Sequence, residues 1–136
     1  MSRFYLLIAG SRHYVDEDTF EREVGEHVGP ASLHHEIVIV EGGAQGADRL
    51  ARQYAEGRGL ELEEFRAEWS KYGRAAGPKR NDKMTAWVKE QAVGHDEALA
   101  LFFWDGESKG TGQCIRSAIA RGLPVKIWNI KTNEYM

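Results

Sequence analysis

The sequence has only one cysteine and no long hydrophobic segment, and both shortages limit what the protein can be. Cys114 cannot form a disulfide within the chain, which fits a reducing compartment. No apolar run approaches the roughly 20 residues that a membrane-spanning helix needs. The apolar stretch 4–9 is short and lacks the basic leader of a signal peptide. We therefore expect a soluble, cytoplasmic protein without a membrane partner.

The chain also lacks an excess of positive charge. It carries 18 Lys and Arg against 21 Asp and Glu, which gives a formal net charge of −3. Proteins that bind duplex DNA or RNA non-specifically rely on a basic surface, so we do not expect duplex nucleic acid as a partner. A local basic pocket remains compatible with this composition. The five histidines show no zinc-ligand spacing with one another or with Cys114, so we expect no metal and no cofactor.

What is present is typical of one small globular domain. Hydrophobic residues make up 42% of the chain and charged residues 29%, which argues against disorder. A chain of this length buries roughly two thirds of its unfolded surface, enough for a core of its own. The glycines lie at expected turns rather than in a low-complexity tract. We expect residues 1–136 to form a single domain.

Apolar runs and helical stripes alternate along the chain. Asp16 is a suitable cap for the first helix, Gly29-Pro30 should end it, and Pro78 suits the start of the third. Alternating strands and helices predict a three-layer α/β/α Rossmann-like sandwich with a mostly parallel five-stranded sheet. We expect residues 131–136 to be a mobile end. The predicted strands are 4–9, 36–40, 60–65, 98–104 and 124–128.

The continuity of the apolar runs predicts the strand order. Runs 4–9 and 98–104 are apolar throughout, as in strands buried on both faces, whereas 60–65 and 124–128 alternate, as in edge strands. The order is then 3-2-1-4-5. A ligand crevice is expected above the C-terminal ends of strands one and four, where the crossovers change direction. Four loops should converge there: 10–12, 42–48, 69–81 and 105–112.

The turn between the second strand and the second helix carries the strongest ligand signal. Glycines let a backbone turn tightly and approach a ligand, and the free N–H groups and positive dipole end of a helix bind anions. A turn that uses glycine only for its backbone angles is the alternative. We expect phosphate contacts from Gly42, Gly43, Ala44 and Gly46.

Two cations stand where a helix dipole disfavours them. Lys79 and Arg80 fall in the expected first turn of the helix that begins at Pro78. An anionic ligand would reverse the unfavourable sign, and the planar guanidinium of Arg80 suits phosphate or carboxylate. The alternative is a solvated arginine paired with a neighbouring acid.

Two further loops add weaker phosphate signals. Gly110-Thr111-Gly112 precedes the last helix and offers N–H groups and the threonine hydroxyl as donors. Gly10-Ser11-Arg12 ends the first strand and is a candidate for the same ligand, although an Arg12–Asp48 pair that braces two loops explains it as well. Asp48 is a candidate acceptor for a ribose hydroxyl, or it simply complements the helix dipole.

Aromatic and acidic residues near the same loops suggest the rest of a site. Trp69, Tyr72 and Trp104 are candidates for stacking on a base, because flat rings accept many heterocycles. Glu68 and Asp105 are candidate acid–base groups, and exposed acids near loop ends are otherwise solvated.

Taken together, these motifs resemble the SLOG superfamily of Rossmann-like proteins, named for SMF/DprA and LOG, and especially its YspA, cpYpsA-related branch. The resemblance lies in segments 10–12, 42–48, 69–81 with Met84, and 108–111. It implies a nucleotide or nucleotide-derived ligand and makes a homodimer a fair expectation. The implied positions are Gly42, Gly43, Gly46, Gly110 and Thr111 around phosphate, and Arg80 and Asn81 near phosphate or ribose.

The resemblance leaves the activity open. The first expectation is a domain that binds its ligand as a sensor or to sequester it. The alternative is a hydrolase of the N-glycosidic bond in nucleoside monophosphates or NAD-like derivatives, as in the LOG enzymes. Those enzymes use an arginine at a place like Arg80 and a glutamate where this chain has Cys114, so Glu68, Asp105 or Glu107 would have to replace it. The DprA side of the superfamily suggests single-stranded nucleic acid as a second alternative.

Overall fold

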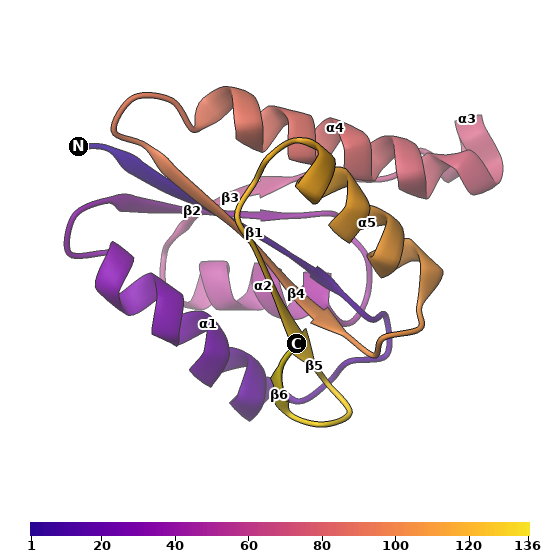
Figure 1. The fold of residues 1–136 in the computed structure, drawn as a ribbon, viewed down its shortest axis with the longest axis horizontal. Helices are drawn as coiled ribbons and strands as arrows, with labels where there is room; N and C mark the ends of the chain where they lie inside the picture. Colours follow the sequence, from indigo (N-terminus) through magenta and orange to yellow (C-terminus); the bar gives the residue numbers. More distant parts are fainter.

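A six-stranded sheet runs through the middle of the molecule, with helices on both faces (Figure 1). The computed structural model describes residues 1–136. Its elements are β1 (Arg3–Gly10), α1 (Glu17–Ala31), β2 (Glu36–Glu41), α2 (Ala47–Gly57), β3 (Glu61–Glu64), α3 (Trp69–Tyr72), a 3-10 turn (Gly73–Ala75), α4 (Ala76–Gln91), β4 (Glu97–Trp104), α5 (Lys109–Ala120), β5 (Val125–Asn129) and β6 (Glu134–Tyr135).

The sheet order is β3-β2-β1-β4-β5-β6, and β1 to β5 are parallel. The three-layer fold and the relative order of the first five strands are therefore confirmed. β1 and β4 pair from Phe4 with Glu97 to Gly10 with Phe103, so their C-terminal ends lie side by side. The crossovers change direction between these two strands, which places the expected ligand crevice at their C-terminal ends.

The apolar run of β1 supplies both faces of the sheet. Phe4, Leu6 and Ile8 belong to the core under α1 and α2, whereas Tyr5 and Leu7 belong to the core under α4 and α5. Successive side chains of a strand point to opposite faces, so only a continuous apolar run can fill two cores. This arrangement explains why the uninterrupted runs became the central strands.

The structure adds a sixth strand to the five that were expected, and this strand lies in the segment expected to be a mobile end. Trp128 pairs with Tyr135 in an antiparallel ladder, and their rings meet edge to face with centroids 4.9 Å apart. The Asn129 side chain accepts the N–H groups of Lys131 and Thr132, and Asn133 has a φ of 56°. Asparagine tolerates this left-handed conformation, so the chain turns tightly and returns as β6.

Two helix boundaries also differ from the expectation. Asp16 caps α1 as expected by accepting from Thr19 N at 3.1 Å, but α1 continues through Pro30 to Ala31. Near a helix end a proline removes one hydrogen bond without stopping the turn. Residues 69–81, expected to be one of the four loops, are helical: they hold α3, the 3-10 turn and the start of α4, which begins at Ala76 rather than at Pro78. No helix in the structure has the length and apolar character required to span a bilayer.

Candidate functional site

A cavity of about 280 Å³ lies at the C-terminal ends of β1 and β4, where all four expected loops meet. Ala9 and Gly10 from β1 lie at its base, with Met84 from α4 and Cys114 from α5. Eleven of the sequence-predicted site residues line it: Gly10, Ser11, Arg12, Ala44, Asp48, Trp69, Arg80, Asn81, Asp105, Gly110 and Thr111.

Besides the stacking candidates Tyr72 and Trp104, the cavity lining lacks five predicted site residues: Gly42, Gly43, Gly112, Glu68 and Gly46. The Gly42 carbonyl accepts from Arg80, and a Cβ added to Gly43 would meet the side chain of Arg66. Gly112 lies against Trp104. Glu68 is exposed and lies 4.0 Å from the Lys71 ammonium, four residues beyond the end of β3.

Gly46, the fifth, joins two walls of the cavity. A Cβ there would collide with the carbonyl oxygen of Ser11, and its φ of 72° is one that other residues rarely adopt. The close approach allows Ala47 N to donate to the Ser11 carbonyl at 3.2 Å. Gly46 therefore fixes the 42–48 turn against the loop after β1.

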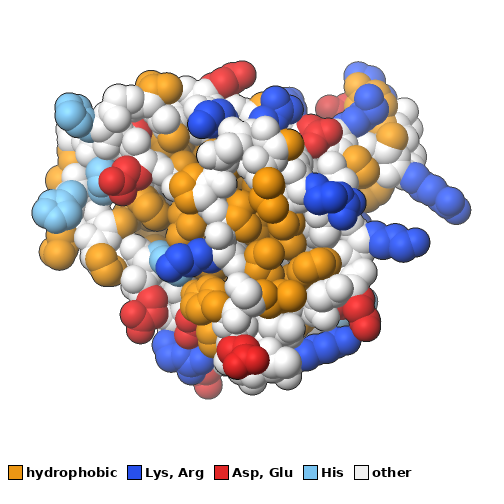
Figure 2. Space-filling view, viewed as in Figure 1, with side chains coloured by type: hydrophobic (Ala, Val, Ile, Leu, Met, Phe, Trp, Pro, Cys, Tyr) orange, Lys and Arg blue, Asp and Glu red, His pale blue; other side chains and the backbone are white.

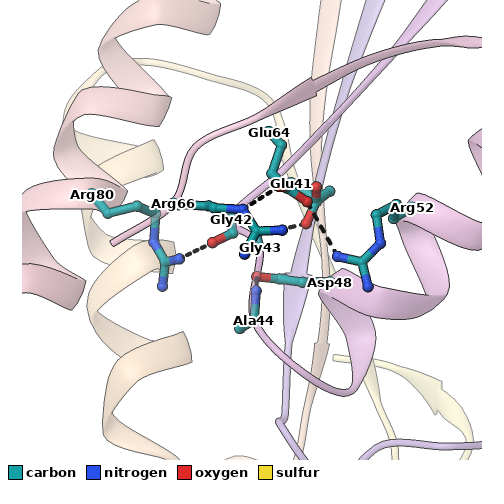
Figure 3. Close-up of polar contacts among 9 residues, drawn as sticks. All are labelled: Glu41, Gly42, Gly43, Ala44, Asp48, Arg52, Glu64, Arg66 and Arg80. Atoms are coloured by element: carbon teal, nitrogen blue, oxygen red, sulfur yellow. Dashed lines mark hydrogen bonds and ion pairs between the residues drawn. The ribbon is translucent and has the colours of Figure 1, made fainter. Parts of the chain in front are cut away.

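Arg80 is the best-fixed cation of the cavity. Its Nε donates to Asn81 Oδ1 at 2.7 Å, and its Nη1 donates to the Gly42 carbonyl (Figure 3). Asn81 is buried and donates to Gln113 of α5 at 2.8 Å. Arg80 forms no ion pair with a carboxylate, and its Nη2 has no partner within the chain. The guanidinium is thus positioned by neutral groups and keeps hydrogen-bonding capacity.

Asp48 is buried at the edge of the cavity and is 5% exposed. Its Oδ2 accepts from Ala44 N at 3.1 Å. Burial raises the pKa of this carboxyl, while Arg80 and the backbone donors of the turn oppose the increase. The Asp48–Arg12 pair considered from the sequence does not form, because the Arg12 guanidinium lies over the Trp69 ring.

Trp69 forms an aromatic wall at the mouth of the cavity. Its side chain is 49% exposed, and its ring rests over Gly77. The Arg12 guanidinium carbon lies 5.5 Å from the ring centroid. Tyr72 is outside the lining, and Trp104 donates its Nε1–H to the Ser108 carbonyl at 3.0 Å and so holds the loop before α5.

The positive charge that the chain lacks as a whole is concentrated beside this wall. Residues 69–83 contain five Lys or Arg and one Asp, although the chain carries a net charge of −3. Lys71 and Lys79 place their ammonium groups 5.0 and 4.8 Å from the Tyr72 ring centroid. Figure 2 shows Lys and Arg side chains gathered at the end of the molecule that carries α3. This concentration is a local basic region, compatible with an anionic ligand.

Two comparisons with known proteins bear on this site. The model of the YspA, cpYpsA-related SLOG family matches residues 4–72, which include the glycine turn and Trp69. The Gene 61 protein of Mycobacterium phage D29 is 37% identical over 127 residues, which cover 88% of this chain and 92% of that protein. The chain belongs to the YspA, cpYpsA-related SLOG family. Membership suggests a nucleotide-related function, and it confirms the family expected from the motifs.

Asp105, just before α5, is hydrogen-bonded to its own loop, and Cys114, on α5, is buried. Asp105 Oδ1 accepts the N–H groups of Glu107 and Ser108 and the Ser108 hydroxyl, and these backbone bonds lower the pKa of Asp105. Glu107 pairs with Lys131 at 3.2 Å. Burial raises the pKa of Cys114 to about 12, so its thiol is protonated and a poor nucleophile. No group of three His, Cys, Asp or Glu side chains is arranged to hold a metal ion.

Glu41, the last residue of β2, was not expected to take part in the site. Its side chain is completely buried, and burial next to Glu64 raises its pKa to about 8. A carboxyl directly after four buried apolar residues and directly before Gly42-Gly43 was the available signal. Its burial depends on β3, which lies alongside and carries Glu64 opposite Glu41.

Proposed function

We propose that this SLOG domain binds a nucleotide or nucleotide-derived ligand and acts as a sensor or sequestering domain. One observation carries the proposal. A single cavity is lined at once by the Arg80 guanidinium, by the first turn of α5 and by the half-exposed ring of Trp69. These groups suit the two chemically different parts of a nucleotide, its phosphate and its base.

The phosphate end of the proposed site is the start of α5. Its cap residue, Ser108, provides no side-chain hydrogen bond, and the N–H groups of Gly110 and Thr111 have no partner within the chain. Unpaired N–H groups at a helix start, together with the helix dipole, favour anions. Arg80 adds a fixed positive charge and the Thr111 hydroxyl a further donor.

The base end of the proposed site is Trp69 with Arg12. An exposed indole beside a guanidinium offers stacking and cation–π contacts to a nucleobase, and these contacts do not depend on which base it is. The cavity volume of about 280 Å³ lies near the lower end of the range for small-molecule sites, which starts at about 300 Å³. The site therefore suits a mononucleotide, or the nucleotide part of a larger ligand that extends toward solvent.

Hydrolysis of an N-glycosidic bond is a second candidate function, favoured by Asp48. It is the one acid lining the cavity whose pKa is raised, and it lies beside Arg80. A carboxyl with a raised pKa beside a phosphate-binding arginine is suited to assist a departing base. Glu68 and Asp105, expected from the sequence as acids for this role, are exposed or already hydrogen-bonded to their own loop.

Calorimetric titration of the purified full chain with AMP, ADP, NAD and a short single-stranded oligonucleotide tests the proposal. We expect saturable binding of at least one mononucleotide or dinucleotide, weakened about tenfold to a hundredfold by Arg80→Ala, because the variant loses a charge-assisted hydrogen bond. Lys83→Ala is the matched control, since Lys83 is exposed on the same helix and does not line the cavity. Binding unchanged in Arg80→Ala, or binding of the oligonucleotide alone, would contradict the proposal.

Chromatography of the reaction mixtures separates the second candidate from the first. If the protein is a hydrolase, free base accumulates with the parent chain and does not accumulate with Asp48→Asn. This variant keeps the shape of the side chain and removes its acid. Binding without any released base supports a sensor or sequestering domain.

A further inference from the structure

One peptide group connects the buried acid Glu41 with the cavity. The N–H of Gly43 donates to Glu41 Oε1 at 2.6 Å, and the carbonyl of Gly42 accepts from Arg80 Nη1 (Figure 3). These two atoms belong to the same planar peptide, so they cannot move independently. Glu41 and Arg80 therefore hold opposite ends of a single rigid unit.

Gly42 and Gly43 are packed closely against the side chains on both sides of this peptide. A Cβ on Gly42 would lie 2.5 Å from Arg80 Nη1 and 2.9 Å from Asp48 Oδ2. A Cβ on Gly43 would lie 2.9 Å from Arg66 Cγ, and Gly43 has a φ of 72°. Any shift of the peptide therefore reaches the guanidinium on one side and the Glu64–Arg66 pair on the other.

The second oxygen of Glu41 indicates where its proton lies. Oε2 is buried and receives no hydrogen bond. Glu64 stands opposite in the parallel ladder, and both of its oxygens already accept, from Arg66 Nε at 2.6 Å and Arg52 Nη1 at 3.2 Å. Glu64 is thus held as the carboxylate, and Glu41 must supply the proton between the two.

The charges around the pair favour this division. A hydrogen bond from Glu41, together with Arg52 and Arg66, lowers the pKa of Glu64. Burial raises the pKa of Glu41 to about 8, and the charges of Glu64 and Asp48 add to the increase. The facing groups come from three elements or their flanks: Asp48 and Arg52 from α2, Glu64 and Arg66 from the β3 edge, and Arg80 from α4 across the turn.

We propose that Glu41 is a positioning residue that works in its protonated form, with its proton shared with Glu64 and its other oxygen holding the Gly42–Gly43 peptide that orients Arg80. Loss of this proton sets the buried Glu41 carboxylate against the partly exposed Glu64 carboxylate, and their repulsion displaces the peptide and the guanidinium. The anion site is therefore linked to pH through a group that does not touch the ligand. The effect on affinity rests on the proposed function, whereas the effect on Arg80 does not.

The linkage has a definite sign. The protonated acid is the binding-competent form, so affinity for an anion is constant well below the titration of Glu41 and falls above it. One proton limits the fall to about tenfold per pH unit. Reciprocity requires that anion binding raises the proton affinity of Glu41 by the same factor by which protonation of Glu41 raises the affinity for the anion.

Nuclear magnetic resonance of the ligand-free chain tests the structural part directly. The Glu41 carboxyl carbon should titrate near pH 8, and the Gly43 amide and the Arg80 Nε–H should shift over the same interval. Glu41→Gln keeps an acceptor for Gly43 and a donor toward Glu64, so it should hold both resonances at their low-pH positions. Glu61→Gln, which removes an exposed carboxyl of β3, should change nothing. The proposal is overturned if Glu41 titrates near its ordinary pKa of 4.5, or if the Arg80 resonance does not shift as Glu41 titrates.

Glu64→Gln is a second variant that does not require a change at the buried position. Removal of the neighbouring charge should lower the pH at which Glu41 titrates, and the Arg80 resonance should follow by the same interval. An Arg80 transition that stays at its original pH overturns the proposal.

AMP affinity between pH 6.5 and 9.5 tests the functional part, because the second phosphate ionisation, near pH 6, lies below this range. The parent chain should lose affinity above pH 8, and Glu41→Gln should bind AMP with little pH dependence. An equal loss in both proteins overturns the linkage and leaves the proposed function standing. No AMP binding at any pH, with the resonances moving together, rejects AMP as the ligand and supports the positioning role.

Discussion

Two glycine-containing turns border the cavity, and they differ in where their backbone donors point. In the 42–48 turn, Gly43, Ala44 and Ala47 donate to Glu41, Asp48 and Ser11. At the start of α5, Gly110 and Thr111 donate to nothing in the chain. The turn with the stronger sequence signal is therefore the internally bonded one, and the weaker signal marks the turn that is open to an anion.

This difference separates two uses of glycine. In the 42–48 turn, glycine permits close contact between elements, because side chains at Gly42 or Gly46 would strike Arg80 or the loop after β1. At Gly110 nothing lies within 4 Å of an added Cβ. The first turn is built to hold its neighbours, and the second is accessible to a ligand.

Gly46→Ala should produce the largest effect, a loss of more than about 3 kcal/mol in the free energy of unfolding, because it combines backbone strain with a backbone collision. Urea denaturation followed by circular dichroism measures it. Gly57→Ala is the matched control on α2, where nothing lies within 4 Å, and it should change stability by less than about 1 kcal/mol. Equal stability of the two variants would remove the structural distinction between the turns.

The buried acid of the bonded turn should make stability depend on pH. The pKa of Glu41 rises from 4.5 to about 8 on folding, so the folded state keeps a proton that the unfolded chain releases. Its stabilising contribution is complete below pH 4.5 and is lost as pH rises through 8, with a slope of up to about 1.4 kcal/mol per unit. Glu64 acts below this window, because its pKa is lowered.

Denaturation of the parent chain and of Glu41→Gln at intervals between pH 5 and 9 measures this slope. The parent should lose stability steadily, and the variant should show a flatter profile. A parent whose stability rises over this interval would contradict a protonated Glu41.

The open turn should tolerate a side chain and lose its ligand. Gly110→Asp places a carboxylate at the start of α5, where the helix dipole favours it, so the free energy of unfolding should stay the same or rise by up to about 1 kcal/mol. AMP affinity should fall about tenfold or more, since the carboxylate occupies the anion position. Gly110→Ala controls for bulk. Calorimetry that finds Gly110→Asp and Gly110→Ala equally able to bind would place the anion elsewhere.

The aromatic wall should contribute the smallest effect. Trp69→Ala should lower AMP affinity about fivefold, near the lower limit for a base stacked on one ring, because half of the indole stays exposed without ligand. Stability should hardly change. Tyr72→Ala, on the same short helix but outside the cavity, should leave affinity unchanged. A larger loss from Tyr72→Ala would move the ligand onto the basic region beside α3.

The relative order of the first five strands could be predicted because the apolar pattern of a strand reflects how many of its faces are buried. Continuous apolar runs became β1 and β4 in the centre, and the partly acidic run became edge strand β3. The two residues of β6 gave no such signal, since a two-residue strand has no periodicity and depends on the Asn129 and Asn133 turn. The helix α3 was missed because Gly73 and Gly77 follow it closely, and glycines at that spacing are typical of a loop.

The site could be located from the sequence but not resolved into roles. Parallel strands bring their following loops together, so the convergence of Arg80, Trp69 and Thr111 was predictable from topology. Which donors remain free depends on side chains that fold back onto the turns, as Glu41 and Asp48 do. The side chains involved are close in sequence to the donors, but the burial of Glu41 depends on the register of β2 with β3, which no local motif encodes.

An amide-resonance titration of the ¹⁵N-labelled chain with AMP shows which of the two turns receives the phosphate. We expect saturable shifts that are largest at Gly110, Thr111 and the Arg80 Nε–H, with smaller shifts at Gly43 and Ala44. Largest shifts at Gly43 and Ala44 would contradict this expectation, because they would show that the internally bonded turn, rather than the start of α5, receives the phosphate.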